Sequence, residues 1–166
     1  MKITKYIIGI VIASLLFFAS CQEDDGFKDF NAGGTNTKAF AGEWFVRSYD
    51  ADGVATSDYH KITTFNTALD NDSIWIADDG FINFKIKTLT NTSDLSFSSE
   101  NEKNIEVDEE TITLTEGKIL EDQGKSIKTK TIIDSIALKI VKSTSPDEII
   151  LIGGHRRTGF VEDKIK

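Results

Sequence analysis

Residues 81–90 read Phe-Ile-Asn-Phe-Lys-Ile-Lys-Thr-Leu-Thr, and this stretch decides the fold class. Ile82, Phe84 and Ile86 alternate there with Asn83 and two lysines. A period of two is the repeat of a β-strand, whose successive side chains point to opposite faces of a sheet. The stretch therefore predicts a strand with one buried face and one face in water.

The same alternation continues on both sides of this strand, with many β-branched and aromatic residues. Further strands are expected over residues 42–49, 59–69, 73–77, 132–141, 148–152 and 156–161, with short ones at 95–97 and 112–114. Turn-forming residues separate them at 50–53, 70–72, 78–80, 122–125 and 145–147. No stretch after residue 21 repeats apolar residues at helical spacing, so we predict an all-β domain.

About eight to ten short strands in one domain, joined by hairpins, are typical of a closed barrel or a sandwich. We expect a single antiparallel up-and-down β-barrel of about eight strands, because closure removes exposed strand edges. Such a barrel holds either its own side chains or one small ligand. The predicted barrel domain comprises residues 40–166.

The first 21 residues have the pattern of a secretory signal. Lys2 and Lys5 precede an almost wholly apolar run over residues 6–18, and small residues follow at 19–20. The run is too short to cross a bilayer comfortably, since a spanning helix needs roughly 20 residues. With Cys21 directly after the small residues, the segment resembles a bacterial lipoprotein signal. This resemblance implies removal of residues 1–20 and acyl chains on Cys21.

The lipoprotein pattern predicts anchoring in the outer membrane of a Gram-negative cell, with residues 21–39 as a flexible acidic tether. Residues 22–25, Gln-Glu-Asp-Asp, resemble the export tag that sends some Bacteroidetes lipoproteins to the cell surface. A solvated linker is the alternative reading of these four residues. A secreted protein with a free Cys21, or an uncleaved helical anchor, is the alternative to the lipoprotein.

Composition narrows the choice of partner. The chain has 27 acidic and 19 basic residues, and loss of the predicted signal with its two lysines would change the net charge from −8 to −10. Such a surface repels nucleic acid, which is bound through clustered lysine and arginine. Cys21 is the only cysteine, so its acylation leaves no thiol for a disulfide, a zinc site or a nucleophile. We expect no cofactor.

The sequence gives little support for calcium binding or for serine hydrolysis. The aspartate-rich turns at 50–53 and 70–73 do not fit a calcium-binding EF-hand loop, because Val54 and Ile74 stand where a side-chain ligand is needed. We therefore expect no metal site. His60 and His155 are the only histidines, and no Gly-x-Ser-x-Gly motif occurs, so a serine hydrolase remains the third hypothesis for the function.

Three segments carry a resemblance to a known family. They are Ala41-Gly42-Glu43-Trp44, residues 65–76 and residues 154–160. Together they resemble the "lipid-binding putative hydrolase" family of Bacteroidetes lipoproteins. The resemblance covers most of the chain after about Phe40 and implies the fold of that family.

A wider resemblance is to lipocalin-like barrels, which begin with Gly-x-Trp and close with an arginine packed over that tryptophan. Gly42 and Trp44 match the first part, and Arg156 or Arg157 matches the second. A guanidinium on an indole face contributes about 0.5–2 kcal/mol and would plug one barrel end. A bulge at residues 153–154 would exchange the two faces of the last strand, so the sequence leaves open which arginine faces inward.

The leading functional hypothesis is a non-enzymatic protein that binds a small hydrophobic or lipid-like ligand. The expected ligand contacts are the inward apolar residues and a polar group near the barrel opening: Trp44, Val46, Ile82, Phe84, Ile86, Phe97, Ile136, Leu138, His155 and Arg157. The same apolar residues would also pack into a solid core. A filled barrel favours the alternative of a surface assembly or interaction lipoprotein with a protein or glycan partner.

Overall fold

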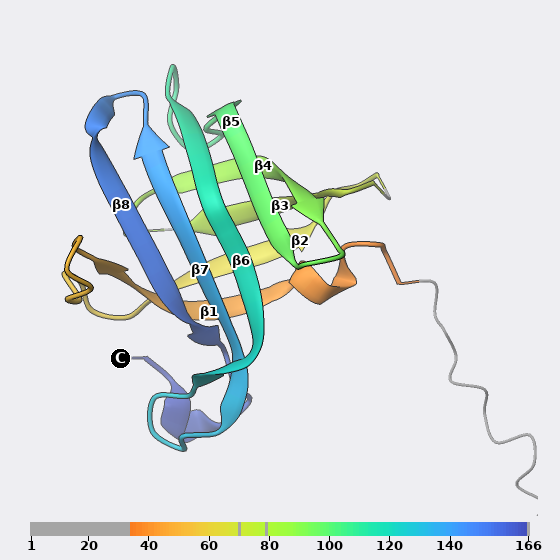
Figure 1. The fold of residues 1–166 in the computed structure, drawn as a ribbon, viewed down its shortest axis with the longest axis vertical. Helices are drawn as coiled ribbons and strands as arrows, with labels where there is room; N and C mark the ends of the chain where they lie inside the picture. Colours follow the sequence, from red (N-terminus) through yellow and green to blue (C-terminus); the bar gives the residue numbers. More distant parts are fainter. Residues whose placement is uncertain (1–33, 70, 79, 166) are drawn as a thin grey trace, which may run out of the picture. The chain divides into compact units, whose positions relative to one another are not determined.

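The computed structural model describes residues 34–69, 71–78 and 80–165. Within them, eight strands follow one another around a closed antiparallel barrel, and the last strand pairs with the first (Figure 1). The strands are β1 (Gly42–Tyr49), β2 (His60–Asn66), β3 (Ser73–Asp78), β4 (Phe84–Asn91), β5 (Ser96–Lys103), β6 (Thr111–Lys125), β7 (Ile132–Lys142) and β8 (Ser145–Arg156). Short 3₁₀ helices, η2 (Lys38–Phe40) and η3 (Val161–Asp163), flank them. The prediction of a single antiparallel β-barrel is confirmed.

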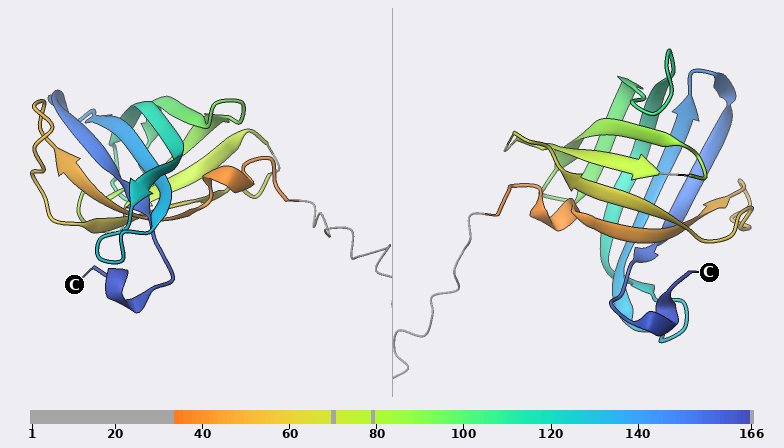
Figure 2. Two further views of the ribbon diagram at one scale, coloured as in Figure 1. Left: turned by 60° about the horizontal axis from the view of Figure 1, so that its bottom comes forward. Right: turned by 180° about the vertical axis from the view of Figure 1, so that it is seen from behind.

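The two halves of the barrel cross each other. Strands β5–β8 run steeply across β1–β4, and the long β6 and β7 continue past the barrel at one end (Figure 1). The C-terminal segment after β8 lies beside that extension in all three views (Figure 2). The extension and the C-terminal segment thus form a structure outside the barrel wall.

The barrel interior is filled by one hydrophobic cluster. On β4, Phe84 and Ile86 are fully buried, whereas Lys87 is exposed on the outer face, as the alternation predicts. The cluster comprises Phe40, Trp44, Val46, Ile62, Ile74, Ile76, Ile82, Phe84, Ile86, Phe97, Ile112, Leu114, Ile119, Ile136, Leu138, Ile140 and Ile152. Each fully buried side chain of this size contributes about 1.5–3 kcal/mol. Residues 34–165 therefore contain a core of their own.

Two predicted turns are wrong. Residues 122–125 lie inside β6, and residues 145–147 lie at the start of β8. The β6–β7 ladder shifts register between Leu120 and Gly124, and Asp122 has a φ of 54°. A bulge of this kind accommodates turn-forming residues without ending the strand. The β7–β8 ladder likewise shifts between Val141 and Lys142, which leaves Pro146 beside an irregularity where no ladder hydrogen bond is needed.

Several strand boundaries also differ from the prediction. β5 and β6 extend well beyond the short strands expected at 95–97 and 112–114, β2 ends at Asn66, and β8 is longer than the predicted 148–152 at both ends. The strand predicted over 81–90 begins at Phe84, because the Asp78 carboxylate accepts the backbone N–H groups of residues 80–82 and holds them in a loop. The strand predicted over 156–161 is absent, since β8 ends at Arg156 and η3 follows. Residues 81–83 and 158–161 are thus not paired in the ladders of the described strands.

The bulge that the sequence leaves open at residues 153–154 does not occur. The β8 register is continuous through both residues against β1 and against β7. Gly154 serves a close approach of strands instead: a Cβ there would lie 2.1 Å from the Phe45 carbonyl oxygen. The two faces of β8 are therefore set without a slip.

The packed part of the chain begins earlier than expected. Thr37, in the segment predicted as a tether, is buried and donates its hydroxyl to Asn66 Oδ1 at 2.9 Å. Phe40 of η2 enters the core. Cys21, the predicted signal and residues 22–33 lie outside the described residues. No helix among the described residues is long and apolar enough to cross a membrane.

Candidate functional site

Arg156 closes one end of the barrel. Its guanidinium carbon lies 4.5 Å from the centre of the Trp44 ring. Its three nitrogens donate to Asp134 Oδ2 at 3.0 Å and to the carbonyls of Ala41 and Ala39 at 2.8 and 3.1 Å. A Cβ on Gly42 would lie 2.8 Å from this guanidinium, which explains the small residue there. We call this end the closed end.

Arg157 does not share this role. It faces away from the barrel interior and pairs with Glu43, which also accepts Lys61 Nζ at 2.9 Å. Hydrogen bonds from Lys61 and Arg157 lower the pKa of Glu43. The choice that the sequence leaves open is thus decided in favour of Arg156.

The opposite end of the barrel carries a pocket. β1 runs from the closed end to Ser48 and Tyr49, and the β7–β8 turn lies at this second end, which we call the mouth. The mouth pocket has a volume of about 430 Å³, within the range of small-molecule sites. Its lining residues are Ser48, Tyr49, Thr56, Phe81, Ile82, Lys142, Thr144, Ser145, Glu148 and Ile150.

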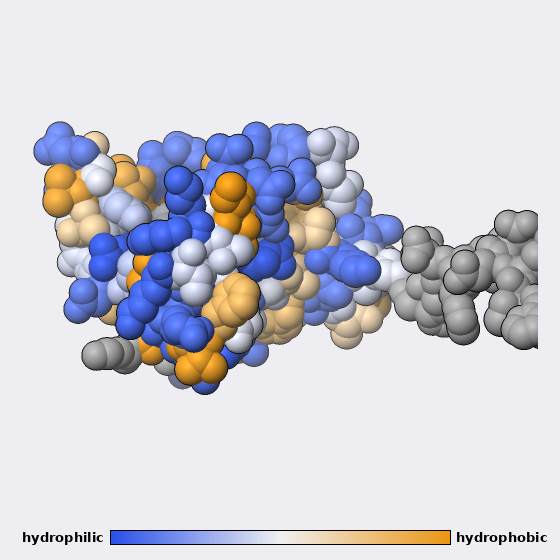
Figure 3. Space-filling model, turned by 90° about the horizontal axis from the view of Figure 1, so that it is seen from below, coloured by the Kyte–Doolittle hydropathy of each residue, from blue (hydrophilic) through white to orange (hydrophobic). Residues whose placement is uncertain are grey.

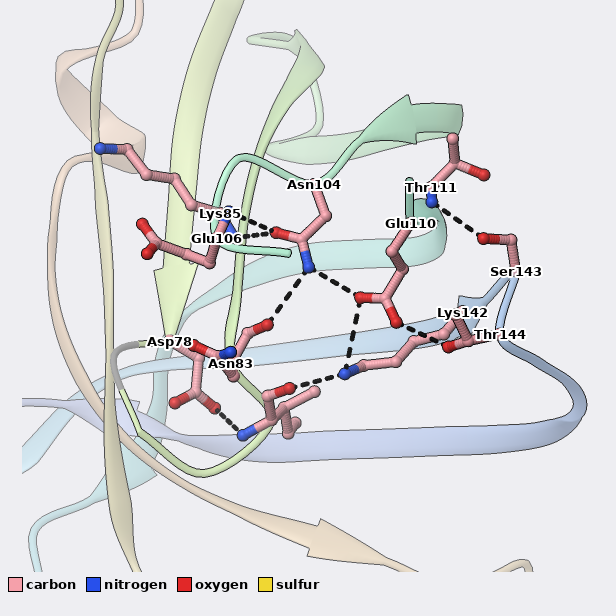
Figure 4. A network of polar contacts seen from close by, with 11 residues as sticks. Asp78, Asn83, Lys85, Asn104, Glu106, Glu110, Thr111, Lys142, Ser143 and Thr144 are labelled. Atoms are coloured by element: carbon pink, nitrogen blue, oxygen red, sulfur yellow. Dashed lines mark hydrogen bonds and ion pairs between the residues drawn. The ribbon is translucent and has the colours of Figure 1, made fainter. Parts of the chain in front are cut away.

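A polar network that includes two residues of the mouth pocket, Lys142 and Thr144, lies beside the pocket (Figure 4). Lys142 Nζ donates to the Ile82 carbonyl at 2.6 Å and lies 3.7 Å from Glu110 Oε1. Glu110 is 4% exposed and accepts Asn104 Nδ2 at 2.7 Å and the Thr144 hydroxyl at 2.6 Å. Burial alone would raise the pKa of Glu110, but these donors and Lys142 outweigh it and lower that pKa. The network therefore holds a charged pair at the wall of the pocket.

The loop between β3 and β4 covers part of the mouth. Asp78 is buried, and its Oδ2 lies 3.3 Å from His60 Nε2. Phe81, half of which is exposed, stacks on the His60 ring with centres 4.5 Å apart. Burial would raise the pKa of Asp78, but His60 and three backbone N–H donors lower it. Asp78 and Lys142 thus fix the loop at its start and at Ile82.

The structure does not bring the predicted ligand residues together at one site, and Arg157 pairs with Glu43 outside the barrel interior. Ile82 lines the mouth pocket. Trp44 lies at the closed end, and the other apolar members lie in the core: Val46, Phe84, Ile86, Phe97, Ile136 and Leu138. His155 lies on the outer wall, 4% exposed, with its ring edge-on to Phe45 and Tyr59. The ligand-binding role of these residues stays a prediction.

Sequence reasoning missed the polar members of the site. Lys142 continues the alternation of Ile136, Leu138 and Ile140 along β7. Residues two apart on a strand share a face, so this spacing could have placed Lys142 on the inward face. Glu110 and Asn104 lie in a stretch with dense charge and weak periodicity, which offered no comparable signal. Their position depends on contacts between strands.

The chemistry available to the histidines is limited. His60 contacts the Asp58 carbonyl and Asp78, and His155 contacts the Arg156 carbonyl through Nδ1. Among the described residues, neither ring hydrogen-bonds to a serine hydroxyl, which a Ser–His nucleophile requires. Residues 34–69, 71–78 and 80–165 also contain no group of three or more His, Cys, Asp or Glu side chains that could hold a metal ion.

Comparison with known proteins adds one finding. The model of a family described as "Lipid-binding putative hydrolase" matches residues 29–161, which include every strand of the barrel. No curated protein matches the chain.

Proposed function

This chain belongs to the "Lipid-binding putative hydrolase" family, and we propose that it binds a small lipid-like molecule at its mouth pocket without chemical conversion. The observation that carries the proposal is the pocket of about 430 Å³ at the mouth, which combines apolar and polar lining residues, in a lipid-binding family. Tyr49, Phe81, Ile82 and Ile150 offer apolar surface there. Each ligand methylene buried against them would contribute about 0.8 kcal/mol.

The packed interior of the described residues leaves no site for a ligand at the barrel centre, and by itself it favours the alternative of a surface interaction lipoprotein. A lipid-like ligand would therefore bind at the mouth. The core cluster fills the barrel between the closed end and Ile82. Lys142, Thr144 and Glu148 supply the polar surface of the same pocket, and Lys142 and Thr144 also bond within the protein, to the Ile82 carbonyl and to Glu110. An amphiphile would thus place its chain against the apolar residues and its head near Lys142.

Binding without catalysis is supported by the surroundings of the histidines. The nitrogens of His60 lie near the Asp58 carbonyl and the Asp78 carboxylate, and neither is hydrogen-bonded to a serine hydroxyl of the described residues. His155 is buried on the outer wall, away from the residues that line the mouth pocket. Hydrolysis remains the alternative that the family description suggests.

We further propose that acyl chains on Cys21 anchor the protein in the outer membrane, with display at the cell surface. Support comes from the order of basic, apolar and small residues before Cys21 and from the acidic residues after it. Cys21→Ser should move the protein from the membrane pellet to the soluble fraction and abolish incorporation of labelled fatty acid. Retention of the variant in the pellet would contradict the anchor.

Neighbouring isoleucines on β8 allow a matched test of the mouth pocket. Ile150 lines the pocket, whereas Ile149 is 53% exposed on the other face of the strand. In a fragment of residues 22–166, which includes every described residue, Ile150→Gln should weaken the binding of a fluorescent fatty acid about tenfold. Ile149→Gln should leave it unchanged, and thermal unfolding of both variants checks the fold. Equal binding by both variants would refute the proposed site.

A further inference from the structure

We propose that the outer wall of the barrel carries a second ligand site, which takes an organic anion. The site is a pocket of about 330 Å³ between the β1–β2 loop, the β6–β7 tip and the C-terminal segment, here called the tail pocket. Its lining residues are Arg47, Asp58, Tyr59, Ile127, Lys128, Lys164 and Ile165. It shares no lining residue with the mouth pocket, so the two proposals stand or fall separately.

A buried carboxylate builds the tail pocket. Asp163 is 1% exposed and accepts the backbone N–H groups of Lys128 and Thr129 at 2.8 and 2.9 Å. It also accepts the hydroxyls of Thr129 and Thr158 at 2.5 and 2.9 Å. These bonds hold the C-terminal segment against the β6–β7 tip and bring Lys128 and Lys164 to one cavity with Tyr59.

The charge of the tail pocket is opposite to that of the chain. Three of its lining residues are basic and one, Asp58, is acidic, although the whole chain has a net charge of −8. Neither Lys128 nor Lys164 forms an ion pair within the part of the chain that the structure describes. An anion in the cavity would neutralise this excess.

Arg47 differs from the two other arginines of the chain. Arg156 and Arg157 each pair with a carboxylate, whereas Arg47 packs its guanidinium 4.1 Å from the centre of the Tyr59 ring. Its Nε is buried and has no hydrogen-bond partner among the described residues. A buried N–H without an acceptor is costly, and a guanidinium binds carboxylate or phosphate through two parallel hydrogen bonds. Arg47 lines the tail pocket, so an acceptor bound there would lie beside a guanidinium that pairs with no carboxylate of the described residues.

The remaining lining residues indicate the class of anion. Tyr59, Ile127 and Ile165 give the pocket apolar surface beside the cations. Figure 3 shows this end of the molecule, where hydrophobic residues lie among hydrophilic ones. The chemistry fits a carboxylate or phosphate that carries a short apolar group, supplied either as a free fatty acid or as a phosphate ester.

Titration of the fragment of residues 22–166 with hexanoate and with hexyl phosphate, followed by amide NMR, tests this site. We expect saturable shifts around Tyr59 and Lys128 at concentrations up to about 10 mM, and none with hexanol, the neutral analogue. Tighter binding of hexanoate would identify a fatty acid as the source, and tighter binding of hexyl phosphate a phosphate ester. Absence of saturable shifts with both anions, or equal shifts with hexanol, would overturn the proposal.

Variants with a matched control complete the test. Arg47→Met keeps the apolar stem on Tyr59 and should weaken binding of the better anion about tenfold. Lys87→Gln removes the same charge on the outer face of β4 and should leave binding unchanged. Hexanoate or hexyl phosphate bound by Arg47→Met as tightly as by the unaltered protein would refute the role of the guanidinium. Arg47→Met should leave the affinity of the mouth pocket for the fluorescent fatty acid unchanged, which separates the two sites.

Discussion

The two tryptophans of the chain allow a sharp test of the barrel. Trp44 is fully buried at the closed end, where its Nε1 donates to the Thr64 hydroxyl at 2.8 Å and Arg156 covers its ring. Trp75 lies on the outer face of β3 and is partly exposed. The same substitution at the two positions compares burial inside the barrel with packing on its surface.

Trp44→Ala removes a large side chain from a site that cannot collapse, because strand pairing holds the wall around it. Substitutions of this kind in protein cores lower the free energy of unfolding by about 3–5 kcal/mol. Loss of the cation–π contact with Arg156 adds about 0.5–2 kcal/mol to the upper end of that range. For a domain of this size the midpoint of thermal unfolding should fall by roughly 10–20 °C. Trp75→Ala should cost about 1–2 kcal/mol, because less surface is buried.

Guanidinium denaturation of the fragment of residues 22–166 measures these free energies. If both variants keep the dependence of the free energy of unfolding on denaturant concentration, their unfolded states are comparable. A loss below about 1 kcal/mol in Trp44→Ala, or an equal loss in the two variants, would refute the packing of Trp44 and the arginine closure with it.

Further predictions concern strand contact, pH and the two arginines. Gly154→Ala should lower stability by about 1–3 kcal/mol in chemical denaturation, because the added Cβ would meet the neighbouring β1 backbone at 2.1 Å. The pKa of Asp163 is lowered in the folded protein, because its hydrogen bonds outweigh the effect of burial. The ionised Asp163 therefore stabilises the fold above the unfolded pKa near 3.8, and this stabilisation is lost as the pH falls toward the folded pKa. Unfolding between about pH 5 and pH 2 should show a weaker pH dependence in Asp163→Asn, and an unchanged slope would contradict this. Arg156→Ala should lower the unfolding midpoint more than Arg157→Ala, whose exposed pair with Glu43 contributes at most about 1 kcal/mol; the reverse order would contradict the assignment of the closed end.

The mouth and the closed end divide the barrel into a stable part and a binding part. The closed end is fully hydrogen-bonded around Trp44 and Arg156, which stabilises the wall without a ligand. The mouth instead carries hydroxyl and charged groups beside exposed apolar surface on Phe81. Such a mixture fits recognition of an amphiphile, because apolar burial gives affinity and a few polar groups give orientation.

Local periodicity was sufficient to predict the fold class and the direction of the side chains on the clearest strands. Alternation at Ile82, Phe84 and Ile86 predicted a one-sided strand, and Trp44 and Val46 entered the core on the face expected of them. These results need only local periodicity, because a strand with one apolar face must bury it. The family resemblance also came from local motifs, and the family match confirmed it.

The contacts between residues distant in sequence followed from the folded barrel alone. The choice of Arg156 over Arg157 depended on the register of β8 against β1, and the pair of Lys142 with Glu110 joins residues from different strands. The tail pocket depends on Asp163, which reaches the β6–β7 tip over more than 30 residues of chain. Local patterns do not encode these contacts, because barrel closure and bulges set which distant residues become neighbours.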